Sequence, residues 1–304
     1  MIKINLVILF ILVTYQVILA QRVLFKSFSE ENGLSGSNIN CVLQDRKGFV
    51  WIGTDNGLNR FDGNDFKIFK QQFNDENTLS DNTIWALCED DKGNIWIGTK
   101  QGVLNKYSPA TEKFLHFKLE STNSIEVSIT TITQDKNGKL WIGTYSQGIF
   151  LFDPVTGKIK KWNFNPNSVN GIGNNYITSI LQDVDGFIWI STYNGLNRFD
   201  PQNPDKGVTK YYSSSDNSNT INNNLVWRVN QSQTDKNLIW ICTANGLCSY
   251  NIKTGIFNRL NIVAEVPLQF SNSFACVVEQ NVFGHNILWA ATYGGLFKID
   301  LNTK

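Results

Sequence analysis

The side chains that could perform acid–base catalysis are few and scattered in this sequence. Of the two histidines, His116 falls inside a predicted strand and His285 falls in a short insertion. There is no Gly-x-Ser-x-Gly elbow, no phosphate-binding loop and no His/Asp cluster with metal-ligand spacing. We therefore expect a chain that is not an enzyme and that needs no metal or cofactor. A lyase or hydrolase is the alternative, with Asp55, Asp81 and Glu126 as its candidate acids.

Aromatic and charged side chains at recurring positions indicate ligand binding more strongly. Several directly follow a threonine that returns every 45 to 51 residues, and the others lie near the start of a second recurring segment. Aromatic rings offer flat apolar faces that suit sugars and other amphipathic ligands. Filling of the central channel is the alternative role for each of them. The predicted ligand-binding residues are Asp55, Trp85, Lys100, Tyr145, Tyr176, Tyr193, Trp227, Arg228 and Tyr293.

These side chains are carried by six copies of one motif. The first copy, WIGTDNGLNRFD at residues 51–62, returns in altered form at intervals of 45, 45, 48, 51 and 49 residues. A small residue always stands third, and the leading tryptophan and fourth-position threonine never change. A fixed period of this size indicates a solenoid, a propeller or an array. The predicted framework residues are Trp51, Trp96, Trp141, Trp189, Trp240 and Trp289, with Thr54, Thr99, Thr144, Thr192, Thr243 and Thr292.

Each period contains four extended segments separated by turn residues. In the second period, we predict strands at 83–90, 94–99, 103–108 and 113–119. The first turn reads Asp-x-x-Gly-x-x-Trp in four copies, in which aspartate would accept backbone hydrogen bonds and glycine would take a positive φ. A calcium loop at 183–186 is a weaker alternative. The asparagines just before the first strands, expected to cap turns, are Asn82, Asn175, Asn224 and Asn272.

Four strands per repeat and six repeats predict an all-β fold, a β-propeller of four-stranded antiparallel blades. Blades stack face to face, which explains tryptophan at one position and a small residue at another. Residues 22–28 match a fourth strand, and the sequence stops after a third one. An N-terminal strand that completes the last blade would close the ring and cover two sheet edges. We expect either a closed six-bladed ring or part of a seven-bladed one.

The first twenty residues have the pattern of an export signal. Lys3 precedes the apolar run 6–13, and Ala20 offers a small residue for cleavage. We expect a signal peptide at 1–20, a propeller domain at 21–304 and no membrane span in the mature chain, with an uncleaved anchor as the alternative. The protein would then be periplasmic or extracellular. A net charge of +1 argues against a nucleic-acid partner.

Five cysteines are spread too thinly for a disulfide framework. Each stands where other repeats have small or apolar residues, so buried thiols are expected. Cys242 and Cys248 flank one hairpin and would form a bridge only if its register placed them opposite each other.

The Trp-Ile-Gly-Thr tetrad with Asn-Gly-Leu-Asn-Arg-Phe-Asp resembles the repeat of the two-component regulator propellers, across essentially the whole mature chain. The resemblance implies the exported sensor region of a bacterial hybrid two-component system, often one that senses glycan breakdown products. Its implied partners are a small-molecule or oligosaccharide ligand and either a membrane-bound histidine kinase or further propeller repeats. Sensors of that family usually carry more repeats, and no kinase motif is present here. A protein-binding scaffold is a further alternative.

Overall fold

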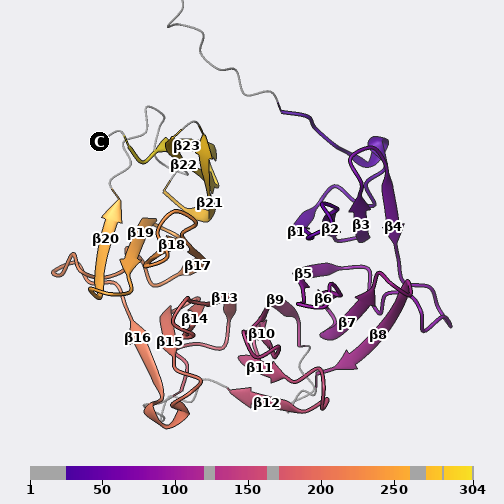
Figure 1. The fold of residues 1–304 in the computed structure, drawn as a ribbon, viewed down its shortest axis with the longest axis horizontal. Helices are drawn as coiled ribbons and strands as arrows, with labels where there is room; N and C mark the ends of the chain where they lie inside the picture. Colours follow the sequence, from indigo (N-terminus) through magenta and orange to yellow (C-terminus); the bar gives the residue numbers. More distant parts are fainter. Residues whose placement is uncertain (1–24, 120–126, 163–170, 261–271, 283, 303–304) are drawn as a thin grey trace, which may run out of the picture.

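The structure, a computed structural model, describes residues 25–119, 127–162, 171–260, 272–282 and 284–302. Its strands form six antiparallel sheets set around a common centre like the blades of a propeller (Figure 1). The predicted all-β propeller of six repeats is therefore confirmed. The predicted signal peptide lies outside the described residues, and no described helix is long and apolar enough to cross a membrane.

The first three blades follow the sequence order from the centre outwards. The first comprises β1 (Ile39–Gln44), β2 (Val50–Thr54), β3 (Gly57–Phe61) and β4 (Phe66–Phe69). The second comprises β5 (Ile84–Glu89), β6 (Ile95–Thr99), β7 (Val103–Ser108) and β8 (Lys113–Lys118). The third comprises β9 (Ile129–Gln134), β10 (Leu140–Thr144), β11 (Ile149–Phe152) and β12 (Ile159–Trp162). The four strands predicted for the second repeat agree with these bounds to within a residue.

The last three blades repeat this order, with one strand fewer at the end. The fourth comprises β13 (Ile177–Gln182), β14 (Ile188–Thr192), β15 (Gly195–Phe199) and β16 (Val208–Tyr211). The fifth comprises β17 (Val226–Gln231), β18 (Leu238–Thr243), β19 (Gly246–Asn251) and β20 (Ile256–Leu260). The sixth comprises β21 (Phe274–Val282), β22 (His285–Thr292) and β23 (Gly295–Asp300). The short 3-10 turns Glu30–Asn32 and Pro204–Lys206 complete the elements.

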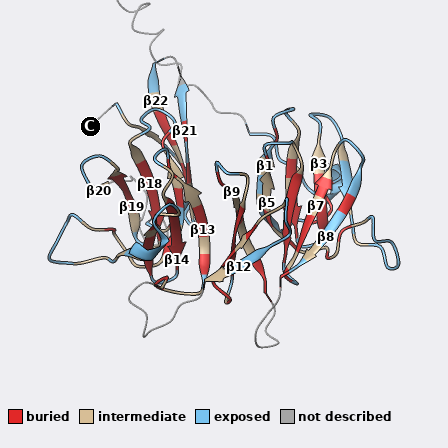
Figure 2. Ribbon diagram, turned by 60° about the horizontal axis from the view of Figure 1, so that its bottom comes forward, coloured by how far each residue is buried: buried red, intermediate tan, exposed pale blue. Residues whose placement is uncertain are grey.

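Burial follows from the stacking of blades. The two middle strands of each blade carry most of the buried residues, whereas outer strands such as β8 and β12 are largely exposed (Figure 2). The repeated tryptophans of the first five blades are buried, and all five lie in apolar clusters shared between neighbouring blades. These five side chains therefore pack between blades.

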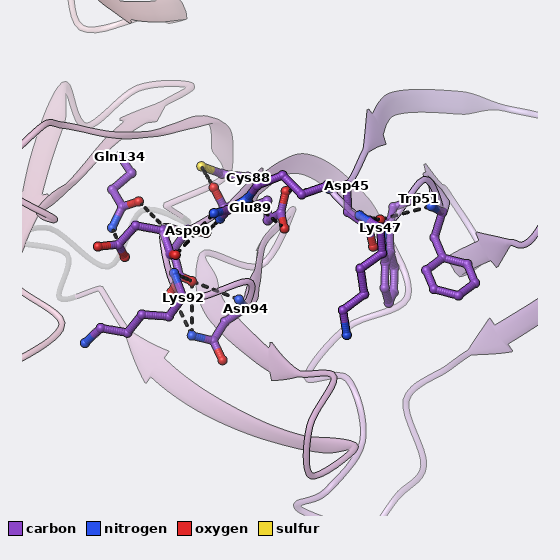
Figure 3. A network of polar contacts seen from close by, with 12 residues as sticks. Asp45, Lys47, Trp51, Cys88, Glu89, Asp90, Lys92, Asn94 and Gln134 are labelled. Carbon is purple, nitrogen blue, oxygen red and sulfur yellow. Dashed lines mark hydrogen bonds and ion pairs between the residues drawn. The ribbon is translucent and has the colours of Figure 1, made fainter.

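The Asp-x-x-Gly-x-x-Trp turns use both oxygens of the aspartate. In the second blade, Asp90 Oδ1 accepts the backbone N–H groups of Lys92 and Asn94 (Figure 3). Asp90 Oδ2 accepts the indole N–H of Trp96 at 2.8 Å. The turns at Asp45, Asp135 and Asp183 repeat the same three bonds. At Asp183 both carboxylate oxygens therefore accept N–H donors. This is the arrangement expected of a turn aspartate, and it favours the turn interpretation over a calcium loop.

A second set of bonds joins the turns at Asp45, Asp90 and Asp135 to the next blade. Arg46 N–H donates to Glu89 Oε2 at 3.0 Å, and Asp91 N–H donates to Gln134 Oε1 at 2.7 Å (Figure 3). Lys136 N–H makes the same bond to Gln182 at 2.7 Å. We call these bonds the blade latch. The acceptor always stands at the end of an innermost strand, which fixes the height of one blade against the next.

The repeated threonine closes the turn between the second and third strands. In the first blade, Thr54 Oγ1 donates to the carbonyl of Gly57 at 3.0 Å and accepts the N–H of Asn56 at 3.0 Å. The other five threonines make the equivalent pair of bonds. Asn82 and Asn224 were expected to cap turns, but each side-chain oxygen instead accepts a backbone N–H just after the fourth strand of the preceding blade, from Gln71 at 2.8 Å and from Ser213 at 2.7 Å.

The ring is open between the sixth and first blades (Figure 1). The expected N-terminal strand does not complete the last blade: residues 25–28 form no strand, and Phe28 packs on Phe61 and Phe66 of the first blade. Residues 22–24 lie outside the described residues. Val42 on β1 is 62% exposed, whereas its counterparts Ile132, Ile180, Val229 and Val277 are 2–6% exposed. The face of β1 is thus built to receive a preceding blade and has none among the described strands.

The five cysteines are free thiols. Cys242 lies opposite Leu247 and Cys248 lies opposite Ile241, so the hairpin register separates the two. Both are buried, and burial raises the pKa of Cys248 to about 12. The expectation of buried thiols is confirmed for this pair, while Cys41, Cys88 and Cys276 are partly exposed.

Candidate functional site

The innermost strands surround a central cavity of about 630 Å³. All six of them contribute to its wall, so the cavity runs along the axis of the propeller. Its lining mixes aromatic rings near one end with threonine, serine, asparagine and aliphatic side chains along the wall. A cavity of this volume, with a few polar groups among apolar ones, is typical of a small-molecule site.

Six aromatic rings form a continuous row at one end of the strands. Centroids of successive rings are 6.4, 5.0, 5.4, 5.9 and 6.2 Å apart. Tyr176 stacks on Tyr193 with an interplanar angle of 18°, whereas the other neighbours meet edge to face or tilted. Such contacts hold each ring in place. We call this row the aromatic arc: Trp85, Tyr145, Tyr176, Tyr193, Trp227 and Tyr293.

The residue that follows each repeated threonine is held in position by one backbone hydrogen bond. Tyr145 N–H donates to the carbonyl of Ser128 at 2.9 Å, and Tyr193 N–H donates to that of Tyr176 at 3.2 Å. The same bond recurs in the other four blades, from Asp55, Lys100, Ala244 and Tyr293. A rigid backbone therefore presents six variable side chains at equivalent points around one end of the cavity. This arrangement was predicted from the order of strands within a blade.

Every innermost strand has a β-bulge near its start, which the sequence did not reveal. The extra residue has no partner on the second strand of its blade; the six are Asn40, Trp85, Thr130, Thr178, Trp227 and Ala275. Thr130 Oγ1 donates across to the carbonyl of Ile177 at 2.7 Å, and Thr178 Oγ1 donates to that of Val226 at 2.6 Å. Bulges re-aim side chains, and here they turn these residues towards the next blade.

Two of the six bulges carry tryptophan instead of a bridging polar group. Trp227 Nε1 donates to Ser273 Oγ at 3.1 Å, so this ring still links the fifth blade to the sixth. Trp85 contacts the ring of Tyr145 in the third blade. The bulge therefore explains why residues on innermost strands can join an arc made mainly of turn residues. The only sequence signal would have been a hydroxyl, amide or aromatic side chain at this position in five of the six repeats, with Ala275 in the sixth.

Asp55 and Lys100 lie at the rim rather than in the wall of the cavity. The Asp55 carboxylate accepts the amide of Asn40 at 2.7 Å and that of Asn38 at 3.1 Å. These bonds, and the charge of Lys100, hold the pKa of Asp55 below its ordinary value. The carboxylate is thus ionised and already engaged, which suits a rim residue that fixes Asn40 better than a proton donor.

The structure brings most of the predicted ligand-binding residues together. Those that line the cavity are Trp85, Tyr145, Tyr193, Trp227, Arg228 and Tyr293. Tyr176 belongs to the arc through its stacking on Tyr193, while Asp55 and Lys100 remain at the rim. Burial, together with the neighbouring tyrosines, raises the pKa of Tyr193. The phenol of Tyr193 is therefore a neutral hydrogen-bonding group at ordinary pH.

The groups considered for catalysis do not meet at this cavity. His116 lies on the outer strand β8, and its Nε2 contacts the carbonyl of Thr78. His285 pairs with Asp300 at 3.0 Å on the sixth blade. Asp81 is buried and accepts backbone N–H groups of Thr83 and Gln101. Glu126 lies outside the described residues. The described lining of the cavity includes no histidine and no acid.

Comparison with protein families bears out the resemblance seen in the repeats. The family model described as "Two component regulator propeller" matches residues 33–56, 78–101, 123–146 and 171–194. The chain therefore carries two-component regulator propeller repeats. A histidine kinase P4 of Formosa agariphila is 50% identical over 46 residues, which are 15% of this chain and 3% of that protein. The matched segment thus spans a small part of the curated relative.

Solved structures share the propeller architecture. An extracellular domain assigned to a hybrid two component system of B. thetaiotaomicron is 24% identical, with a TM-score of 0.71 over 91% of this chain and 35% of that one. PorZ, a surface component of the type-IX secretion system of Porphyromonas gingivalis, is 17% identical with a TM-score of 0.64, over 86% and 38%. Virginiamycin B lyase of Staphylococcus aureus is 13% identical with a TM-score of 0.62, over 90% and 87%.

Proposed function

We propose that this chain is the exported, ligand-sensing propeller of a two-component signalling system, and that it is not itself catalytic. Its ligand, a small molecule derived from a glycan, binds in the central cavity against the aromatic arc. The proposal places a histidine kinase elsewhere in the signalling protein or in a partner. It also assigns residues 1–20 to the export signal.

One observation carries the assignment of the site. A repeated framework of tryptophan, threonine and small residues holds six rings of differing identity and orientation at the mouth of a 630 Å³ cavity. Channel filling alone would not need exposed rings, yet Tyr145, Tyr193 and Tyr293 are 39–67% exposed. Exposed rings that are held rigidly by their neighbours are pre-organised for a flat ligand, which lowers the entropic cost of binding.

The assignment to signalling is supported by the repeats. Four segments match the two-component regulator propeller model, and a further match is to part of a histidine kinase. The cavity wall supplies neutral hydroxyls and amides beside the rings, which are the groups that hydrogen-bond sugar hydroxyls. The described lining offers no histidine and no carboxylate for proton transfer, so binding fits this site better than turnover.

Calorimetry with a panel of oligosaccharides tests the proposal. We expect at least one to bind, and we expect Trp227→Ala and Tyr193→Ala each to weaken it by about fivefold, since one lost ring contact is worth roughly 1 kcal/mol. Phe73→Ala is the matched control, because Phe73 is exposed and does not line the cavity. Binding that ignored both arc substitutions would refute the site, and absence of any binding would refute the ligand class.

A further inference from the structure

Arg228 stands where the other five blades have small side chains. Its position opposite the third residue of the repeated motif is taken elsewhere by Cys41, Ala86, Thr131, Ser179 and Cys276. The side chain follows the bulged Trp227 directly and lines the central cavity. One blade alone therefore places a long cationic group where the repeat otherwise leaves space.

Arg228 also differs from the other arginines of the described residues. Arg46 pairs with Glu89, and Arg259 donates to five carbonyl or hydroxyl oxygens. Arg60 and Arg198 lie over the rings of aromatic neighbours. The guanidinium of Arg228 makes no hydrogen bond, ion pair or ring contact with any described residue. Its five N–H donors are thus available to a ligand.

The cavity has no opposing charge. Arg228 is the single charged residue among those described in its lining, so the wall carries a net positive charge. The charge acts across the cavity as well, because it works to lower the pKa of the Cys41 thiol on the first blade, although burial is the larger cause and raises that pKa to about 12. A concave site with one sign of charge concentrates ions of the other sign.

The surrounding groups define the rest of such a ligand. Trp227 and Tyr193 line the same cavity as the guanidinium, and Thr131 has a hydroxyl at the equivalent height on the third blade. A sugar ring against the arc would direct an oxyanion substituent inward to Arg228. Guanidinium matches carboxylate and sulfate oxygens with two parallel hydrogen bonds.

We propose that the cavity selects an acidic sugar, one that bears a carboxylate or sulfate group, and that Arg228 is its anion-binding residue. This inference rests on the proposed function and narrows it from glycan-derived ligands to anionic ones. Neutral sugars meet the same rings and hydroxyls but leave the guanidinium without a partner. Selectivity therefore resides in one side chain that the repeat pattern does not require.

The test compares acidic and neutral oligosaccharides of two to four residues by calorimetry. The acidic set contains uronic-acid and sulfated oligosaccharides in separate arms, and the neutral set contains the methyl esters of the same uronic-acid oligosaccharides. We expect the tightest binder to be acidic and Arg228→Gln to weaken it tenfold or more, with Arg228→Lys intermediate because lysine keeps charge without the bidentate geometry. Binding of the acidic ligand should also weaken as salt rises.

The outcomes distinguish failure of the Arg228 anion site from failure of the proposed sensing function. If a methyl ester binds as tightly as its parent acid, or if Arg228→Gln leaves acid binding unchanged, the anion assignment is wrong. Should that neutral ligand still lose affinity in Trp227→Ala, the sensing site itself stands. Failure of both sets to bind would overturn both. An unchanged unfolding midpoint of Arg228→Gln serves as the control for folding, since this side chain is exposed and without a described partner.

Discussion

Glu279, on the sixth blade, takes the part of the turn aspartate that is missing from the fifth blade. Ser232 occupies the turn position held by aspartate in the first four blades, because its N–H bonds to the carbonyl of Leu238 as Asp183 does to that of Phe187. The carboxylate comes instead from β21 of the next blade. Glu279 accepts the indole N–H of Trp240, the hydroxyl of Ser232 and backbone N–H groups of the turn. Glu279 thus accepts both the tryptophan N–H that aspartate accepts in the first four blades and the backbone N–H of the blade latch.

Glu279→Ala should therefore lower the free energy of unfolding by about 3 kcal/mol, because it leaves several buried donors without an acceptor. The hydrogen bonds of Glu279 outweigh its burial and hold its pKa below the ordinary value of 4.5. A lowered folded-state pKa stabilises the protein above the unfolded pKa, and the gain disappears as pH falls through the folded one. The difference from wild type should stay constant above about pH 5 and shrink in more acidic solution.

Denaturant unfolding between pH 3 and pH 8 measures this difference. Glu112→Ala is the control, since Glu112 pairs with Lys67 on the exposed surface and should change stability little. An effect of Glu279→Ala no larger than that of Glu112→Ala would contradict the role given to the shared carboxylate.

At the scale of the strand, the small third residue of the motif sets how closely two blades approach. A Cβ placed on Gly143 would lie 2.5 Å from Cγ2 of Ile177 in the next blade and 2.6 Å from Cγ2 of Thr131. Gly53 meets Ile84 and Cys41 in the same way. The repeat therefore has a small residue here for a steric reason, and β-branched residues on the facing strand fill the space that it leaves.

Gly143→Ala should destabilise the protein by about 1–3 kcal/mol, the usual cost of overpacking a core. The matched control is Ala291→Ser, at the same position in the sixth blade, where no described strand faces it. We expect the control to stay within about 0.5 kcal/mol of wild type. Thermal unfolding of the two variants is the measurement, and equal losses would argue against close blade packing as the cause.

Repetition made part of this fold readable from the sequence. Trp51, Thr54 and Asp45 could be recognised as framework because six or four copies share their spacing, and the strand order within a blade then predicted which side chains meet at one end. The bulges at Thr130 and Thr178 depend on register between strands, which no residue pattern states. The transfer of a carboxylate to Glu279 crosses from one blade to another, so it could not be predicted from the fifth repeat alone.

At the scale of the whole molecule, the open ring leaves two blade faces without neighbours. Leu296 on β23 is 53% exposed, although Leu58, Leu104, Leu196 and Leu247 in the same position are fully buried. Together with the exposed Val42, this exposed leucine is consistent with the expected alternative of a partial seven-bladed ring.

A pair of equivalent substitutions tests whether the ring is open in solution. Leu247→Ala should cost about 2–5 kcal/mol, as for a buried leucine, whereas Leu296→Ala should cost about 0.5 kcal/mol or less. Denaturant unfolding of both variants gives the comparison. Similar large losses would show that Leu296 is covered in the isolated chain and that the ring closes on itself.

The sixth blade has three described strands, and β23 is the outermost of them. The outer edge of β23 presents backbone N–H and C=O groups that no described strand pairs, and such an edge is a template for strand addition by another polypeptide. Lys298 and Asp300 put charge on this strand, which discourages such pairing. Self-association of the isolated chain, followed by light scattering as concentration rises, should begin at β23, and removal of the Lys298 charge should promote it.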